Sequence, residues 1–400
     1  MNPNSTLRTS ALLRVALLSA VVALSGCNTV KGWFDGDGNS NSSKAAAKPT
    51  ELTEFNPSTT VSRMWTAKAG DGEPRLGLTQ SPAIADGRVY AAAIEGGVRA
   101  FDLQTGANVW HYKSESSISG GPGTGDGLVV FGTLDGDVIA LDAATGAVKW
   151  TAKVLNEVIA APTIGQNTVL VRSNDGRVTA FDAADGQRRW FWVHDLPSLT
   201  VRGNDAPTLG PGFVFVGNDD GTVAALSLTD GRPLWDQAVG LPDGRSELDR
   251  MADVDGTPVL DGTTLFASSY KKQTLAIDAP SGRPLWSQDR GGAGRVGVAS
   301  DRVVVTDPAG LVWALDKNGG SALWQQGGLA RRNLSGAAVQ GDFAVVGDFD
   351  GYLHWWRLDN GDFAARVRVG RDAVRAAPVV VDGILVVQAA DGGLSAYRLQ

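Results

Sequence analysis

The sequence has little cysteine and little histidine. Cys27 is its single cysteine, which excludes a disulfide within the chain and a cysteine-based metal site. The three histidines, His111, His194 and His354, lie far apart in different segments, which favours solvated or core histidines over a shared metal site. We therefore expect no metal and no cofactor.

Positive charge is also in short supply. The chain carries 36 Lys and Arg against 43 Asp and Glu, a formal net charge of −7, and its basic residues form no stripe. Nucleic-acid binding needs a cluster of Lys and Arg that displaces counterions from phosphates. The sequence therefore predicts no nucleic-acid partner.

Long hydrophobic runs are missing as well. The longest apolar stretch runs from Val15 to Leu24, after Arg8 and Arg14, and is too short to span a bilayer comfortably. A basic start, a short apolar centre and small residues at its end are typical of a signal peptide over residues 1–26. The alternative interpretation is a marginal membrane anchor.

The end of this run favours the signal peptide. The letters "LSGC", ending at Cys27, resemble the lipobox of bacterial lipoproteins. That resemblance implies cleavage before Cys27 and lipidation of the cysteine, which would anchor the chain to a bilayer. Asn28 stands where that family's inner-membrane retention signal is an Asp, which implies the outer membrane, with the chain facing the periplasm. Residues 27–60 are rich in Ser, Asn, Lys and Ala, which predicts a flexible linker after the lipidated cysteine.

What the sequence does have is a repeat. The unit reads Gly-x-x-x-Ala-apolar-Asp-x-x-x-Gly-x-x-x-Trp and recurs eight times at intervals of 38 to 51 residues. Its copies open at Gly96, Gly136, Gly176, Gly221, Lys272, Gly310, Gly351 and Gly392. Repeats of this length with several short strands are typical of a β-propeller.

Each conserved position of the unit has a structural explanation. The first Gly supplies positive φ in a hairpin turn, and the Asp can accept hydrogen bonds from the next turn. The Trp offers a large flat surface to the neighbouring blade. Five copies keep the Asp, whereas Ser227, Arg357 and Arg398 replace it, so the pattern does not indicate a ring of catalytic carboxylates.

A second hairpin precedes every unit, which gives four strands per blade. The eighth copy stops at Gln400 without its last strand, and "VSRMWTAK" around Trp65 supplies a matching strand near the other terminus. We therefore predict an all-β fold, an eight-bladed β-propeller of the quinoprotein or Trp-motif type over residues 61–400. Its N-terminal strand closes the last blade, so no sheet edge is left open.

The repeat departs from its pattern at two consecutive connections. In blades one and two, the proline that opens the next blade comes 12 residues after the motif Trp. It comes 17 residues after Trp190 and 23 residues after Trp235. Both enlarged loops are expected on one propeller face, side by side. They carry apolar and charged residues, which predicts a protein-binding patch. Loop drift without a role is the alternative.

The lipobox, the polar linker and the eight Trp-motif blades together resemble the BamB family, the propeller lipoproteins of the outer-membrane β-barrel assembly machinery. "LTVRGNDAPT" (199–208), "SELDRMADVDGTPV" (246–259) and "VVGDFDGYLHW" (345–355) are similar to that family's own segments. The resemblance implies a non-enzymatic scaffold that assists the folding and insertion of outer-membrane β-barrel proteins. It implies binding to the periplasmic domains of BamA through the first two segments, and contact with other members of the complex and with unfolded outer-membrane proteins. The matching positions are Leu199, Val201, Arg202, Asp253 and Asp255.

Two other functions compete with this one. The motif "A-x-D-x-x-T-G-x-x-x-W" also resembles quinoprotein dehydrogenases, eight-bladed propellers that hold pyrroloquinoline quinone over Ca²⁺. Many of those enzymes use a vicinal disulfide, which a chain with one cysteine cannot form, and the sequence offers no evident Ca²⁺ ligand set. The third alternative is a general periplasmic scaffold that binds β-strands or peptidoglycan.

Overall fold

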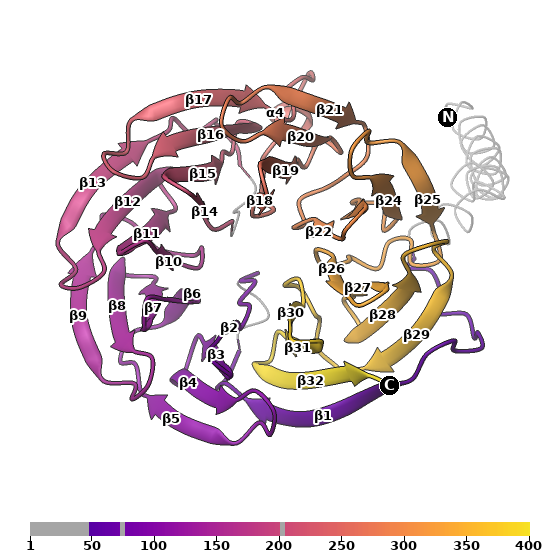
Figure 1. Cartoon of the computed structure of the whole chain (residues 1–400), viewed down its shortest axis with the longest axis horizontal. Coiled ribbons are helices and arrows are strands. Elements are labelled where there is room, and N and C mark those ends of the chain that lie inside the picture. The colour runs from indigo at the N-terminus through magenta and orange to yellow at the C-terminus, as the bar shows by residue number, and fades with distance from the viewer. Residues whose placement is uncertain (1–47, 73–76, 201–204) are drawn as a thin grey trace, which may run out of the picture. The chain divides into compact units, whose positions relative to one another are not determined.

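Each sequence repeat forms one four-stranded antiparallel sheet, and eight such sheets stand around a central axis as the blades of a propeller (Figure 1). The structure is a computed structural model that describes residues 48–72, 77–200 and 205–400. The predicted fold class, an eight-bladed β-propeller, is confirmed. In every blade the first strand lies nearest the axis and the fourth strand lies at the rim (Figure 1).

The strands of the first four blades follow one another in chain order. They are β2 (Ala83–Ala85), β3 (Arg88–Ala93), β4 (Gly97–Asp102) and β5 (Asn108–Tyr112) in blade one; β6 (Ile118–Gly125), β7 (Leu128–Thr133), β8 (Asp137–Asp142) and β9 (Val148–Lys153) in blade two; β10 (Thr163–Gly165), β11 (Thr168–Ser173), β12 (Arg177–Asp182) and β13 (Arg188–Val193) in blade three; and β14 (Thr208–Gly210), β15 (Phe213–Gly217), β16 (Thr222–Ser227) and β17 (Pro233–Ala238) in blade four.

The remaining four blades continue the ring. They are β18 (Val259–Asp261), β19 (Thr264–Ser268), β20 (Thr274–Asp278) and β21 (Pro284–Gln288) in blade five; β22 (Gly297–Val298), β23 (Arg302–Thr306), β24 (Val312–Asp316) and β25 (Ala322–Gln326) in blade six; β26 (Ala338–Gln340), β27 (Phe343–Gly347), β28 (Tyr352–Arg357) and β29 (Phe363–Arg368) in blade seven; and β30 (Val379–Val381), β31 (Ile384–Gln388), β32 (Gly393–Leu399) and β1 (Val61–Lys68) in blade eight.

The first strand closes the last blade, as the sequence predicts. β1 pairs antiparallel with β32, with a register that runs from Val61 opposite Leu399 to Lys68 opposite Gly393. β1 begins at residue 61, and the compact unit that contains the propeller spans Thr50–Gln400. Residues 1–47, which include the expected signal peptide and Cys27, lie outside the described residues.

The motif Trp joins each blade to the next. Trp150, for example, lies opposite Ala140 in its own blade and donates its Nε1–H to the carbonyl oxygen of Ala183 in blade three at 2.9 Å. The turn that receives this ring contains Gly186, whose φ is +74° and whose Cβ, if present, would lie 2.6 Å from the ring. The same bond joins Trp65 to Leu103, Trp110 to Ala143, Trp190 to Leu228, Trp235 to Ala279, Trp286 to Lys317 and Trp324 to Leu358.

Blade seven reverses this arrangement. Trp355 occupies the position of the motif Ala, and Ala365 faces it from the position of the motif Trp. Trp355 is fully buried, donates its Nε1–H to Oε1 of Gln340 at 2.9 Å, and meets Tyr397 of blade eight edge-on at 6.3 Å between ring centroids. This exchange of large and small residues fills the interface where blade eight has no turn to receive a tryptophan.

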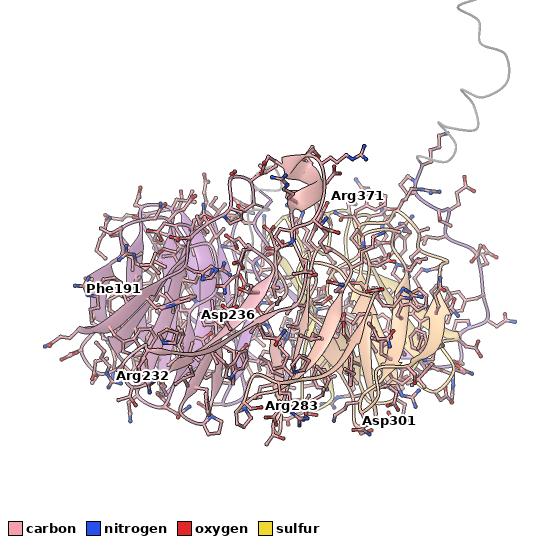
Figure 2. The ribbon with its side chains drawn as sticks, turned by 90° about the horizontal axis from the view of Figure 1, so that it is seen from above. Phe191, Arg232, Asp236, Arg283, Asp301 and Arg371 are labelled. Carbon is pink, nitrogen blue, oxygen red and sulfur yellow. The ribbon has the colours of Figure 1, made fainter. Side chains whose placement is uncertain are left out.

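The antiparallel order of the strands divides the connections between two faces. In Figure 2, α4 (Glu247–Arg250) and Arg371, both in connections between blades, lie at the upper edge, whereas Arg232, Arg283 and Asp301, all in hairpin turns, lie at the lower edge. We call the upper face, which carries all connections between blades, the loop face. Within the described ranges, no helix has the length and apolar character needed to cross a bilayer.

Candidate functional site

The two enlarged loops lie on the loop face, between neighbouring blades. The first covers residues 194–207 and joins β13 to β14, and the second covers residues 239–258 and joins β17 to β18. The described residues of the first loop are 194–200 and 205–207. The second loop rises into α4, which stands above the face in Figure 2.

Local hydrogen bonds shape the second loop around α4. The helix begins with a capping box, in which Asp249 N–H donates to Oγ of Ser246 at 3.2 Å and Ser246 N–H donates to Oδ2 of Asp249 at 3.1 Å. Lys271, in the turn between β19 and β20, donates its Nζ to the carbonyl oxygen of Asp243 at 2.6 Å and also to that of Asp249. The short helix is therefore fastened to blade five.

A groove opens between the two loops. It has a volume of about 490 Å³ and is lined by Pro197, Ser198, Leu199, Pro242, Asp243, Gly244, Glu247 and Arg250. We call it the loop groove. Leu248 beside it is 67% exposed and Leu199 within it is 40% exposed. The two loops therefore share a groove, which Leu199 lines together with the charged residues Asp243, Glu247 and Arg250, and Leu248 follows Glu247 in the chain.

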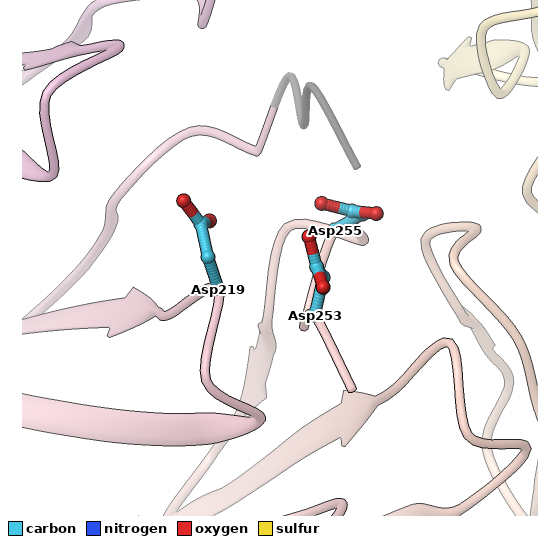
Figure 3. Close-up of side chains that lie close together, drawn as sticks. All are labelled: Asp219, Asp253 and Asp255. Atoms are coloured by element: carbon cyan, nitrogen blue, oxygen red, sulfur yellow. The ribbon is translucent and has the colours of Figure 1, made fainter. Parts of the chain in front are cut away.

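An acidic cluster lies where the second loop descends toward blade five. The side chains of Asp219, Asp253 and Asp255 converge, and one carboxylate oxygen from each lies within 4.8 Å of the others (Figure 3). Asp219 comes from the turn between β15 and β16, whereas Asp253 and Asp255 come from the second loop. Three carboxylates this close could coordinate a cation on geometry alone.

A buried arginine supplies positive charge to this region. Arg172, on β11, donates its Nη2 to Oδ1 of Asp219 at 2.7 Å and forms a second ion pair with Asp205 at the end of the first loop. Its side chain is 10% exposed, so both pairs are shielded from water. Arg172 therefore ties the first loop and blade four to blade three.

Burial and like charges act together on Asp255. Desolvation is the larger cause, followed by the negative charges of Asp253 and Asp219, and together they raise the pKa of Asp255 well above its ordinary value of 3.8. Among the described residues, neither carboxylate oxygen of Asp255 has a hydrogen-bond partner. A buried carboxylate with a strongly raised pKa makes Asp255 a candidate functional residue.

The structure brings together some of the sequence-predicted contact residues and separates others. Leu199 lines the loop groove. Asp253 is fully buried and Asp255 largely so, and both lie in the acidic cluster rather than on the exposed rim of the groove. Val201 and Arg202, like the lipidation residue Cys27, lie outside the described residues.

Sequence reasoning did not include Arg172, Asp205 and Asp219 in the site. One signal was available, because Arg172 interrupts the otherwise uncharged strand "TVLVRS" of β11, all of whose residues are buried. A charged residue at such a position needs a partner. Nothing in the repeat indicates that the partners lie in the first loop and in blade four.

Comparisons with known proteins relate the chain to one family over nearly its whole length. A family model described as outer membrane protein assembly factor BamB matches residues 94–326 and 308–399. The chain is 59% identical over 397 residues to the outer membrane protein assembly factor BamB of Xanthomonas campestris, covering 96% of this chain and 97% of that protein. It is 43% identical to the protein of the same name from Pseudomonas aeruginosa, covering 96% and 98%, and 34% identical to that of Escherichia coli, covering 95% and 97%.

Solved structures include a member of the same family and more distant proteins that share only the propeller fold. The crystal structure of BamB from Moraxella catarrhalis matches with a TM-score of 0.77 and 28% identity, covering 85% of this chain and all of that one. A europium-containing methanol dehydrogenase matches with a TM-score of 0.69 at 15% identity, covering 86% and 88%, which shows a shared propeller fold alone. By its sequence over nearly its whole length and by its fold, this chain belongs to the BamB family of outer membrane protein assembly factors.

Proposed function

We propose that this chain is a non-enzymatic outer-membrane protein assembly factor. Anchored by a lipidated Cys27 and facing the periplasm, it binds the periplasmic domains of a BamA-type barrel-assembly protein and so assists the folding and insertion of outer-membrane β-barrels. Other members of that complex and unfolded outer-membrane proteins are further partners. The observation that carries the proposal is the loop groove, where two enlarged neighbouring loops present exposed leucines on a rigid propeller face.

The proposed contact residues divide into two roles. Leu199, Val201 and Arg202 of the first loop make direct contact with the partner, together with Leu248 beside α4. Asp253 and Asp255 act from beneath the groove, because their carboxylates are buried in the acidic cluster. A family resemblance supports these positions, and the exposure of Leu199 and Leu248 supports the first role.

The test is affinity purification of the lipidated chain in mild detergent, with partners identified by mass spectrometry. Leu248→Asp and Arg202→Glu are compared with the wild type, and Leu155→Asp is the matched control. Leu155 is 81% exposed on the loop face, in the connection between β9 and β10, and lies outside both loops. Wild type and control should recover a barrel-assembly protein, and the two loop variants should recover at least tenfold less.

Two results would overturn the proposal. Recovery of no barrel-assembly protein by the wild type would remove the assembly function. Equal loss in Leu155→Asp and Leu248→Asp would show that the loop groove is not the contact. A quinone absorbance band in the purified wild type would favour the dehydrogenase alternative instead.

A further inference from the structure

The segment before β1 packs against blade seven, although its composition predicts a linker. Thr50 N–H donates to the carbonyl oxygen of Ala330 at 3.0 Å, and Ser58 N–H donates to that of Ala364 at 2.9 Å. Leu52 packs against the apolar cluster between blades six and seven. We call residues 50–58 the clasp segment. In Figure 1 it runs outside β29 before it enters β1.

Two arginines hold the clasp segment: Arg332, in the connection between β25 and β26, and Arg366, on β29. Arg332 donates its Nη1 to the carbonyl oxygen of Thr50 at 3.1 Å, and Arg366 donates its Nη1 to that of Thr53 at 2.9 Å. The guanidinium of Arg366 also lies 5.1 Å from the ring centre of Phe55, which is in turn 5.4 Å from the ring of Phe363. The segment is therefore fastened by hydrogen bonds, a cation–π contact and an aromatic pair.

A buried polar network orients both arginines. Asp348 is fully buried and accepts a hydrogen bond from Nε of Arg332 at 2.7 Å and another from Nε2 of His354 at 3.0 Å. On its other side, His354 accepts a hydrogen bond at Nδ1 from Nε of Arg366 at 3.2 Å. Arg332, Asp348, His354 and Arg366 thus form one chain of hydrogen bonds, and each end of it reaches the clasp segment.

This network gives a role to a sequence segment that the loop groove leaves unexplained. Asp348 and His354 both lie in "VVGDFDGYLHW", the third stretch that resembles the BamB family. Burying a carboxylate, an imidazole and a guanidinium costs desolvation free energy, which well-placed hydrogen bonds must offset. The hydrogen bonds of this network also direct two guanidinium groups toward the backbone of the clasp segment.

We propose that the clasp segment is a built part of the propeller that fixes where the membrane tether leaves it. Thr50 is bonded to Ala330, which lies in the connection between β25 and β26, so the chain enters the propeller on the loop face. The inference rests on the proposed function, because it takes Cys27 as the lipid anchor. The tether then ends at Thr50 instead of Val61, with a maximal span of about 80 Å, and it leaves the propeller from the loop face.

Hydrogen exchange of the mature full chain in detergent tests the clasp. Arg366→Met removes both of the hydrogen bonds that this side chain makes. Phe55→Ala removes the aromatic contacts and leaves the sequence of every blade unchanged. Arg368→Met is the matched control, because Arg368 lies on the same strand and its side chain contacts Asp350 and the carbonyl oxygen of Gly370, outside the clasp segment.

In peptides covering residues 50–58, the amides of Thr50 and Ser58, which donate to Ala330 and Ala364, should exchange slowly in the wild type and in Arg368→Met. They should exchange at least tenfold faster in Arg366→Met and Phe55→Ala, while peptides of β28 keep their protection. Exchange of the wild-type segment at the rate of a free peptide would overturn the proposal, as would unchanged protection in Phe55→Ala.

Energy transfer to headgroup-labelled lipids tests the exit point. A fluorophore is placed on the cysteine of Leu155→Cys on the loop face or of Arg232→Cys on the opposite face, and the lipidated chain is added to vesicles. Transfer should be stronger from position 155, and the difference should shrink in Phe55→Ala. Equal transfer from both positions would overturn the exit point. Failure of the chain to bind vesicles would refute the Cys27 anchor, while the exchange result would still decide the clasp.

Discussion

At the level of single residues, two histidines respond to their surroundings in opposite directions. The hydrogen bond from His194 to Asp220, 2.8 Å between Nε2 and Oδ2, raises the pKa of His194 above 6.5 against the effect of burial. Burial lowers the pKa of His354 below 6.5, although Asp348 opposes that shift. An ion pair at a partly exposed position raises the pKa of one histidine, whereas burial in the core lowers the pKa of the other.

The stability contributions of the two histidines therefore have opposite signs. His194 stabilises the fold at pH values below 6.5, and this contribution is lost as pH rises through its raised pKa. His354 disfavours the fold as pH falls below 6.5, because the unfolded chain binds a proton there first. We expect imidazole NMR titrations to give two midpoints on opposite sides of 6.5. Asp220→Asn should lower the first and leave the second, and two coinciding midpoints would contradict this.

Asp255 is a residue whose charge works against the fold. Its raised pKa means that the folded protein loses stability as pH rises from about 4, since the unfolded carboxyl ionises first. We expect Asp255→Asn to raise the melting temperature at pH 8, and the gain over the wild type to disappear near pH 4. Scanning calorimetry at several pH values measures this. If the variant also recovers less barrel-assembly protein, Asp255 lowers stability but contributes to binding. A difference in melting temperature between variant and wild type that stays constant across pH would contradict the electrostatic origin.

At the level of elements, the contact of motif Trp with turn Gly is the unit that joins blades. Gly186 and Gly127 offer a matched pair, because both have positive φ, +74° and +73°, but only at Gly186 would a Cβ meet a tryptophan ring. Gly127→Ala should cost about 1–2 kcal/mol from backbone strain alone. Gly186→Ala should cost roughly 1–3 kcal/mol more from overlap with Trp150. Urea unfolding compares the two, and equal costs would contradict the role of the contact.

The elements also show what sequence reasoning can and cannot reach. The blades, their Trp contacts and the two enlarged loops were predictable, because a repeated Gly and Trp pattern is local and its exceptions are visible as extra length. The acidic cluster was not predictable as a cluster. Asp219 and Asp253 belong to different connections, and only the folded arrangement of the blades brings their carboxylates together. The packing of residues 50–58 was not predictable either. Leu52 and Phe55 lie in a polar segment without periodicity, so nothing marks them as core contacts.

At the level of the whole molecule, closure depends on one strand from the N-terminal end. A chain that begins at Ala69 lacks β1 and Trp65 and exposes the edge of β32. We expect it to lose at least the roughly 3–5 kcal/mol of a buried tryptophan and to aggregate. A chain that begins at Thr60 is the control and should remain monomeric. Size-exclusion chromatography with light scattering and thermal unfolding measure both, and a monomeric, stable Ala69 chain would contradict closure by β1.

The pairing of β1 with β32 also sets the order of events when the chain folds. Residues 61 and 399 must meet, so the first strand made is the last to find its partner. Contacts between such distant positions are slow to form, and a partly folded ring leaves strand edges exposed in the meantime. A chain made from its N-terminus therefore keeps its opening strand unpaired until its final residues have followed. We expect the pairing of β1 with β32, rather than the formation of individual blades, to set the time that this protein needs to fold.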